Sequence, residues 1–184
     1  MEQENDAQLV KKYLKGDEHA LRLLYERHIP AVYNFIARIS PSEIDVDDIV
    51  QEAFVKAWKN LKKFNLDLSF RTWLFTIAKN VLLDQIKKKR PMIFSLSDQD
   101  DAFIDVEDSK PLPDAMLDIR DSDERVAILL NELTPAQRAT VVLHVMEDLT
   151  FREIGEVLGQ PMETVKTRYR RAIASLSKQI TNSK

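Results

Sequence analysis

The stretch SFRTWLFTIAKNVLLDQIKKKR, residues 69–90, has the pattern of one long amphipathic helix. Its apolar residues recur at helical spacing and form a stripe that we expect to be buried: Phe70, Trp73, Leu74, Ile77, Ala78, Val81, Leu82 and Ile86. The opposite side is polar and contains Arg71, Thr76, Lys79, Asn80, Gln85 and Lys87. Four consecutive cations, residues 87–90, end the helix before Pro91. The polar side suits a phosphate backbone, but cations at a helix C-terminus also suit the helix dipole, so the stretch alone leaves both interpretations open.

The composition around this stretch predicts an all-helical protein. The 184 residues include three glycines and seven prolines, with almost no strand-like alternation, whereas sheets need more turn residues. An apolar fraction of 44% is enough for the core of one large domain or two small ones. The N-terminal sequence MEQENDAQLVKKYLKGD is polar, and no apolar run reaches the length of a membrane span, so we expect a cytoplasmic protein without membrane insertion.

Several kinds of chemistry are not expected. The chain has no cysteine, which excludes disulfides, thiol catalysis and thiolate metal sites, and its three histidines are scattered. We therefore expect no metal and no cofactor. The carboxylates fall on helix faces or in a linker without a nucleophile and base beside them, so we do not expect an enzyme.

The net charge of −3 hides a segregation of charge along the chain. Residues 98–124 hold eleven acids and two bases, a balance of −9, whereas residues 162–184 hold six bases and one acid, a balance of +5. A basic end beyond an acidic middle allows an anion to bind although the average is acidic.

In the N-terminal part we expect a short helix over residues 7–14 and a second one, capped by Asp17, that runs to about His28. His28 is expected to pack at the end of that helix. Pro30 suits the first turn of a third helix, which ends at Ser40-Pro41.

From Asp45 onward, DVDDIVQEAFVKAWKNLKKF predicts a helix with acids in its first turn. Asp48, Gln51, Glu52 and Val55 share its outer face, a pattern that is more often simply solvated than a docking surface. After it, Phe64 sits beside two lysines. It could stack an unpaired base, but the sequence favours a place in the core.

Residues 91–120 break the helical pattern with prolines, serines and many acids, which predicts a flexible linker between two domains. We expect domains at 1–92 and 121–184, with the acidic linker over 93–120. Beyond a helix over residues 121–133, capping boxes at Thr134 and Thr150 fix two further helix starts.

The sequence LTFREIGEVLGQPMETVKTRYRRAIASLSKQI has helix-turn-helix spacing, with a short helix ending at Gly159 and a second one starting near Met162. Gly155 is expected where the two helices cross. In the second helix Val165, Tyr169 and Ile173 are expected to face inward, which leaves basic and hydroxyl side chains outward, as major-groove reading requires. A structural hairpin with a basic tail is the alternative.

Taken together, four motifs resemble those of the extracytoplasmic-function sigma factors of bacterial RNA polymerase: KGDEHALRLLYERH, DDIVQEAFVKAW, FRTWLFTIAKN and LTFREIGEVLGQPMETVKTRYRRA. The resemblance spans nearly the whole chain. It implies a region 2 helical bundle, a region 4 helix-turn-helix and no region 3 domain between them. Core RNA polymerase, promoter DNA and an anti-sigma factor are the partners that it implies.

The resemblance also implies roles for individual residues. Those docking on the polymerase would be Asp47, Asp48, Gln51 and Glu52. Those at the −10 element would be Lys56, Asn60, Phe64, Asn65, Lys79, Asn80, Asp84 and Lys87. Those at the −35 element would be His144, Glu163, Thr164, Lys166, Thr167, Arg168, Arg170 and Arg171.

Two departures from the family pattern bear on the −35 sequence. Gly155 replaces the usual alanine, and residues 167–172 read TRYRRA where SRLHRA is common. Two other functions remain as alternatives: a helix-turn-helix regulator that acts without the polymerase, and a nucleic-acid enzyme. The first leaves the acidic face and residues 69–90 unexplained, and the second requires a metal- or nucleotide-dependent activity.

Overall fold

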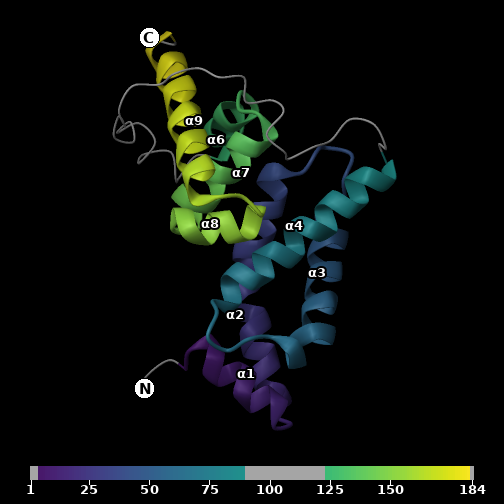
Figure 1. Ribbon diagram of the computed structural model, residues 1–184. Helices are drawn as coiled ribbons and strands as arrows, with labels where there is room; N and C mark the ends of the chain where they lie inside the picture. Colours follow the sequence, from purple (N-terminus) through teal and green to yellow (C-terminus); the bar gives the residue numbers. More distant parts are fainter. Residues whose placement is uncertain (1–3, 90–122, 183–184) are drawn as a thin grey trace. The chain divides into compact units, whose positions relative to one another are not determined.

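The computed structural model describes residues 4–89 and 123–182, and these residues form helices and connecting turns with no strand (Figure 1). Two compact units are present. The N-terminal unit contains α1 (Asp6–Leu14), α2 (Glu18–Ile39), α3 (Val46–Asn60), the short 3-10 helix η1 (Leu61–Lys63) and α4 (Phe70–Lys89). The C-terminal unit contains α6 (Asp123–Asn131), α7 (Pro135–Val141), the π-helix η4 (Val142–Met146), α8 (Phe151–Leu158) and α9 (Met162–Asn182). The all-helical prediction is confirmed, whereas the predicted linker lies outside the described residues.

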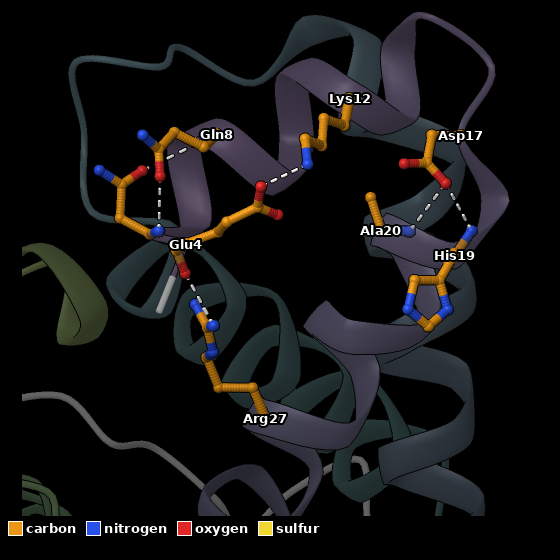
Figure 2. Close-up of polar contacts among 8 residues, drawn as sticks. Glu4, Gln8, Lys12, Asp17, His19, Ala20 and Arg27 are labelled. Atoms are coloured by element: carbon orange, nitrogen blue, oxygen red, sulfur yellow. Dashed lines mark hydrogen bonds and ion pairs between the residues drawn. The ribbon is translucent and has the colours of Figure 1, made fainter. Parts of the chain in front are cut away.

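Polar contacts fix α1 beside α2, as Figure 2 shows. Glu4 forms an ion pair with Lys12, and the Arg27 guanidinium donates to the Glu4 carbonyl at 2.8 Å. Asp17 caps α2, as predicted, by accepting from the backbone N–H groups of His19 and Ala20. The bond from Arg27 holds the N-terminal segment against α2, while the apolar residues Leu9 and Val10 of α1 are buried in the core.

A carboxylate on α1 meets two side chains of α2. Asp6 Oδ2 lies 2.8 Å from His28 Nε2, and Arg27 Nη1 donates to Asp6 Oδ1 at 2.6 Å. Burial alone raises the pKa of Asp6, but the hydrogen bonds and charges of His28 and Arg27 outweigh it, so the pKa lies below its ordinary value. Asp6 therefore stays ionised and fastens α1 to α2.

The predicted helix break near His28 is wrong, because α2 is continuous from Glu18 to Ile39 with Pro30 inside it. His28 accordingly lies in mid-helix and is 5% exposed. A proline inside a helix costs about 3 kcal/mol. Burial of the inner face offsets this cost, since each fully buried apolar side chain contributes about 1.5–3 kcal/mol, and Leu24, Val32 and Phe35 are all at most 1% exposed.

The helix predicted over residues 69–90 is observed as α4, with Ser69 Oγ accepting from the Thr72 N–H at 3.2 Å as its cap. Its burial differs from the prediction of one apolar stripe. α4 packs against both α2 and α3, and Phe75 stands edge-on to Phe35 of α2 at 5.2 Å between ring centroids. Trp73 and Ile77, predicted to be buried, are only half-buried. Because α4 is covered on two sides, it buries a second row of residues in addition to part of the predicted apolar stripe.

The helix-turn-helix of the C-terminal unit is confirmed. Both predicted capping boxes form, at Thr134 with Gln137 and at Thr150 with Glu153. Gly159 ends α8 with φ of +70°, in the left-handed region that glycine tolerates. A Cβ atom on Gly155 would lie 2.7 Å from the Gln160 carbonyl oxygen, so this glycine lets the turn close on the backbone of α8.

Candidate nucleic-acid interface

An acidic patch lies on the outer face of α3, as predicted. Asp47, Asp48 and Gln51 are exposed, Glu52 is half-exposed, and the apolar Val55 is 43% exposed beside them. Asp45 caps the helix by accepting from the N–H groups of Asp47 and Asp48 at 2.9 and 3.3 Å. Because the carboxylates of residues 47 and 48 lie in the first turn, the helix dipole favours them there. The patch offers carboxylates and one apolar side chain to a basic partner.

Behind this patch, polar side chains connect α3 to α4. Lys56 Nζ lies 2.9 Å from Glu52 Oε1 and 3.8 Å from Asp84 Oδ2. Gln85 Nε2 donates to the second oxygen of Glu52 at 3.2 Å. Hydrogen bonds from Lys56 and then from Gln85 lower the pKa of Glu52. The structure therefore brings together residues that the sequence assigned to two separate surfaces.

In the loop between η1 and α4, the side chain of Phe64 is buried. Phe64 is 8% exposed, and its ring packs at 4.9 Å from that of Trp73 and at 5.6 Å from that of Phe70. The ring is thus covered by its neighbours, which corrects its assignment as a stacking surface and agrees with the preference of the sequence for the core. Asn65 is exposed, and its Oδ1 accepts from the Asp67 N–H at 3.0 Å.

Lys79 is not on the outer face of α4, and its assignment to the −10 surface is wrong for this structure. It is 9% exposed and follows Thr72 and Phe75 along the second buried row of α4. Burial lowers the pKa of its ammonium. Asn80, Asp84 and Lys87 are exposed on the same helix.

Asn60, at the far end of α3, is exposed, and its Nδ2 donates to the Lys56 carbonyl at 2.8 Å. Of the predicted −10 contacts on α3 and α4, those that remain accessible are therefore two amides, a carboxylate and two lysines. They suit hydrogen bonds to base edges together with contacts to phosphate.

In α9, the outward face contains most of the predicted −35 residues. Glu163, Thr167 and Arg170 are exposed, and Thr164, Lys166 and Arg171 are half-buried. Lys166 Nζ lies 2.8 Å from Glu163 Oε1. This face of the second helix of a helix-turn-helix carries donors and cations, as a major-groove reader does.

Arg168 was predicted to contact the −35 element from the outward face, but this prediction is wrong because its side chain is only 1% exposed. It shares the inner row of α9 with Val165, Ala172 and Leu176, each with no exposed surface. Tyr169, predicted to face inward, is half-buried instead. Val165 and Ile173 face inward as predicted, but the buried face of α9 also includes Arg168, which contributes to the core of the unit.

An aromatic cluster beside α9 was not predicted from the sequence. His144 stacks on Phe151 at 4.3 Å between ring centroids and meets Tyr169 edge-on at 4.8 Å. Its Nδ1 lies 2.8 Å from the Leu149 carbonyl oxygen. Burial raises the pKa of Tyr169. Because His144 lies in the π-helix Val142–Met146, ordinary helical spacing does not reveal this arrangement.

Comparison with known proteins finds one family match in each of the two units. The family description Sigma-70 region 2 matches residues 24–91, and Sigma-70, region 4 matches residues 124–176. The ECF RNA polymerase sigma factor SigW of Bacillus subtilis is 30% identical over 186 residues, covering 93% of this chain and 94% of the relative. The chain belongs to the ECF sigma factor family. The resemblance stated from the sequence motifs is thereby confirmed.

Further relatives of this sigma factor include RNA polymerase sigma factor CnrH of Cupriavidus metallidurans, 32% identical over 94% of this chain and 92% of the relative. Among solved structures, CnrH in complex with the cytosolic domain of CnrY is similar with a TM-score of 0.70 and 29% identity, covering 97% of this chain and 99% of that chain. The sigma factor RpoE in complex with the anti-sigma factor NepR from Bartonella quintana has a TM-score of 0.66 and 25% identity, with 87% and 96% covered. Within the described parts of this sigma factor, no helix is both long and apolar enough to cross a membrane.

Proposed function

We propose that the acidic patch of α3 docks this sigma factor on core RNA polymerase, with Asp47, Asp48, Gln51 and Glu52 as its contacts. The observation that carries the proposal is the exposure of these four polar residues on one face of a helix within the matched region 2. Val55 adds an apolar contact to the patch, where a partner could exclude water from the neighbouring ion pairs.

The non-template strand of the −10 element would lie along α3, the loop that follows it and α4. The proposed contacts are Lys56, Asn60, Asn65, Asn80, Asp84 and Lys87. Amides and a carboxylate read base edges, while lysines bind phosphate. Opening a promoter costs the unstacking of bases, which contacts to one strand can offset.

The −35 element would lie in front of α9, with Glu163, Thr164, Lys166, Thr167, Arg170 and Arg171 as contacts. His144 would support this surface at its edge through the rings of Phe151 and Tyr169. Each unit is small and would bind weakly by itself, and the polymerase would raise the joint affinity by holding both on one promoter.

Regulation by an anti-sigma factor is part of the proposal, because the similar structures of CnrH and RpoE are complexes with CnrY and with the anti-sigma factor NepR. The chain would act by binding and not by covalent catalysis, in the cytoplasm where polymerase and chromosome meet. The division into a region 2 domain at 1–92, a linker at 93–120 and a region 4 domain at 121–184 completes the proposal.

Co-purification with core polymerase tests the docking surface. We expect Asp48→Lys to weaken retention by core at least tenfold, because it places a cation where the proposed partner is basic. Glu18→Lys is the matched control, since Glu18 is also exposed in the first turn of a helix and therefore loses a similar interaction with the helix dipole. Equal retention of both variants would refute the assignment of the acidic patch.

A further inference from the structure

Lys56 contacts one side chain in each of the two proposed region 2 surfaces. Its ammonium lies 2.9 Å from Glu52 in the acidic patch and 3.8 Å from Asp84 on the strand-facing side of α4. The side chains of Lys56, Glu52 and Asp84 are 42%, 36% and 58% exposed, so partners can reach all three. The Lys56 ammonium is therefore shared between the carboxylate of Glu52, which would contact the polymerase, and that of Asp84, which would contact DNA.

The hydrogen bonds of Glu52 favour this sharing of Lys56. One carboxylate oxygen binds Lys56, and the other accepts from Gln85 of α4 at 3.2 Å. Both hydrogen bonds lower the pKa of Glu52, so it remains a carboxylate at neutral pH. Lys56 is also on the favourable side of an i, i+4 pair, with the acid N-terminal to the base.

We propose that Glu52 and Asp84 hold Lys56 in the free sigma factor, and that polymerase binding at Glu52 releases Lys56 to the phosphates of the non-template strand. This inference rests on the proposed function, because it links its two region 2 surfaces. A phosphate approaching the free protein must compete with two carboxylates for one ammonium, and the three side chains together carry a net negative charge. A cation of the polymerase that pairs with Glu52 removes one competitor. By reciprocity, a strand that engages Lys56 frees Glu52 for the polymerase to the same extent.

A double-mutant cycle in the free protein tests whether Lys56 is shared. The probe is a fluorescent oligothymidylate, whose binding is measured by anisotropy at low ionic strength for the wild type, Glu52→Gln, Lys56→Gln and the double variant. We expect Glu52→Gln to tighten binding about two- to fivefold, the range set by one exposed ion pair, and to have no such effect when Lys56 is already Gln. Far-UV circular dichroism checks that the variants keep their helices.

The matched control is Asp47→Asn, which removes one charge from the same patch but, among the described residues, no partner of Lys56. The sharing of Lys56 would be overturned if Asp47→Asn tightened binding of the oligothymidylate as much as Glu52→Gln does. It would also be overturned if Glu52→Gln still tightened this binding when Lys56 is already Gln. Either result would show a general effect of charge instead.

The release step is tested by repeating the cycle at saturating core polymerase. We expect the advantage of Glu52→Gln over Asp47→Asn to disappear, because the polymerase already occupies Glu52 in the wild type. An undiminished advantage would overturn release by the polymerase. If the wild type formed no complex with core, the proposed function itself would fail and the release step with it, whereas the cycle in the free protein would still decide whether Lys56 is shared.

Discussion

Replacement of Pro30 by alanine should stabilise the N-terminal unit. Pro30 is exposed and lies within the continuous helix α2. It has no N–H to donate to the carbonyl of Glu26, and its ring crowds that carbonyl. Alanine restores the donor without changing the buried face, because the inner residues of α2 lie at other positions of the helix.

The size of the effect follows from two opposing contributions. Alanine is favoured over proline inside a helix by about 3 kcal/mol. Loss of proline also gives the unfolded chain more freedom, which favours unfolding by about 0.4–1 kcal/mol. We therefore expect Pro30→Ala to raise the free energy of unfolding by about 2 kcal/mol, and Pro30→Gly to give about 1 kcal/mol less than that.

Urea unfolding followed by tryptophan fluorescence measures this change, because both tryptophans of the chain, Trp58 and Trp73, lie in the N-terminal unit. With a slope of about 2 kcal/mol per molar urea, the midpoint should rise by about 1 M. Asn34→Ala is the matched control, since Asn34 is exposed one turn further along α2 and should gain at most about 0.7 kcal/mol. A Pro30→Ala variant no more stable than Asn34→Ala would refute the reasoning.

Three further predictions concern charged side chains. Asp6→Asn should lower stability at neutral pH by about 1–2 kcal/mol. Since the pKa of Asp6 is depressed, its contribution is present above about pH 4 and is lost on acidification, so the wild type and the variant should converge in acid-unfolding curves. Lys79→Met should raise the free energy of unfolding at pH 7 by about 1–2 kcal/mol, because burial disfavours the charged ammonium of Lys79. In urea titrations this gain should shrink as the pH approaches about 10, where the lysine loses its charge in the unfolded chain as well. A gain that does not change with pH would contradict this cause. Lys166→Ala with Arg170→Ala should weaken promoter binding and reduce the slope of log affinity against log salt by about 2; an unchanged slope would exclude α9 as the contact surface.

Helix ends could be predicted from the sequence because capping is local. Asp17, Ser69, Thr134 and Thr150 each accept backbone N–H groups two or three residues further along the chain. The turn at Gly159 is equally local, since a left-handed backbone conformation favours glycine there. These features do not depend on which other helix packs nearby.

The orientation of helix faces could be predicted only in part, because it depends on how many neighbours cover a helix. Lys79 is buried since α4 packs against two helices, and Arg168 occupies the inner row of α9 where the motif suggested an outward cation. The continuity of α2 through Pro30 likewise depends on the burial of its inner face, which local propensity does not include. Within the candidate site, the acidic patch could be predicted from helical periodicity alone. The connection of Glu52 to Asp84 through Lys56 could not be predicted, because it depends on the packing of α3 on α4.

Transcription from a fragmented bacterial genome, with core polymerase and this sigma factor as the only proteins, tests the central claim most directly. The 5′ ends of the transcripts are mapped and compared with those made by core alone. We expect a discrete set of start sites that require the sigma factor and share two upstream sequence elements at a fixed spacing. Transcripts indistinguishable from those of core alone, although the protein is folded and present in excess, would contradict the claim that this chain directs the polymerase to promoters.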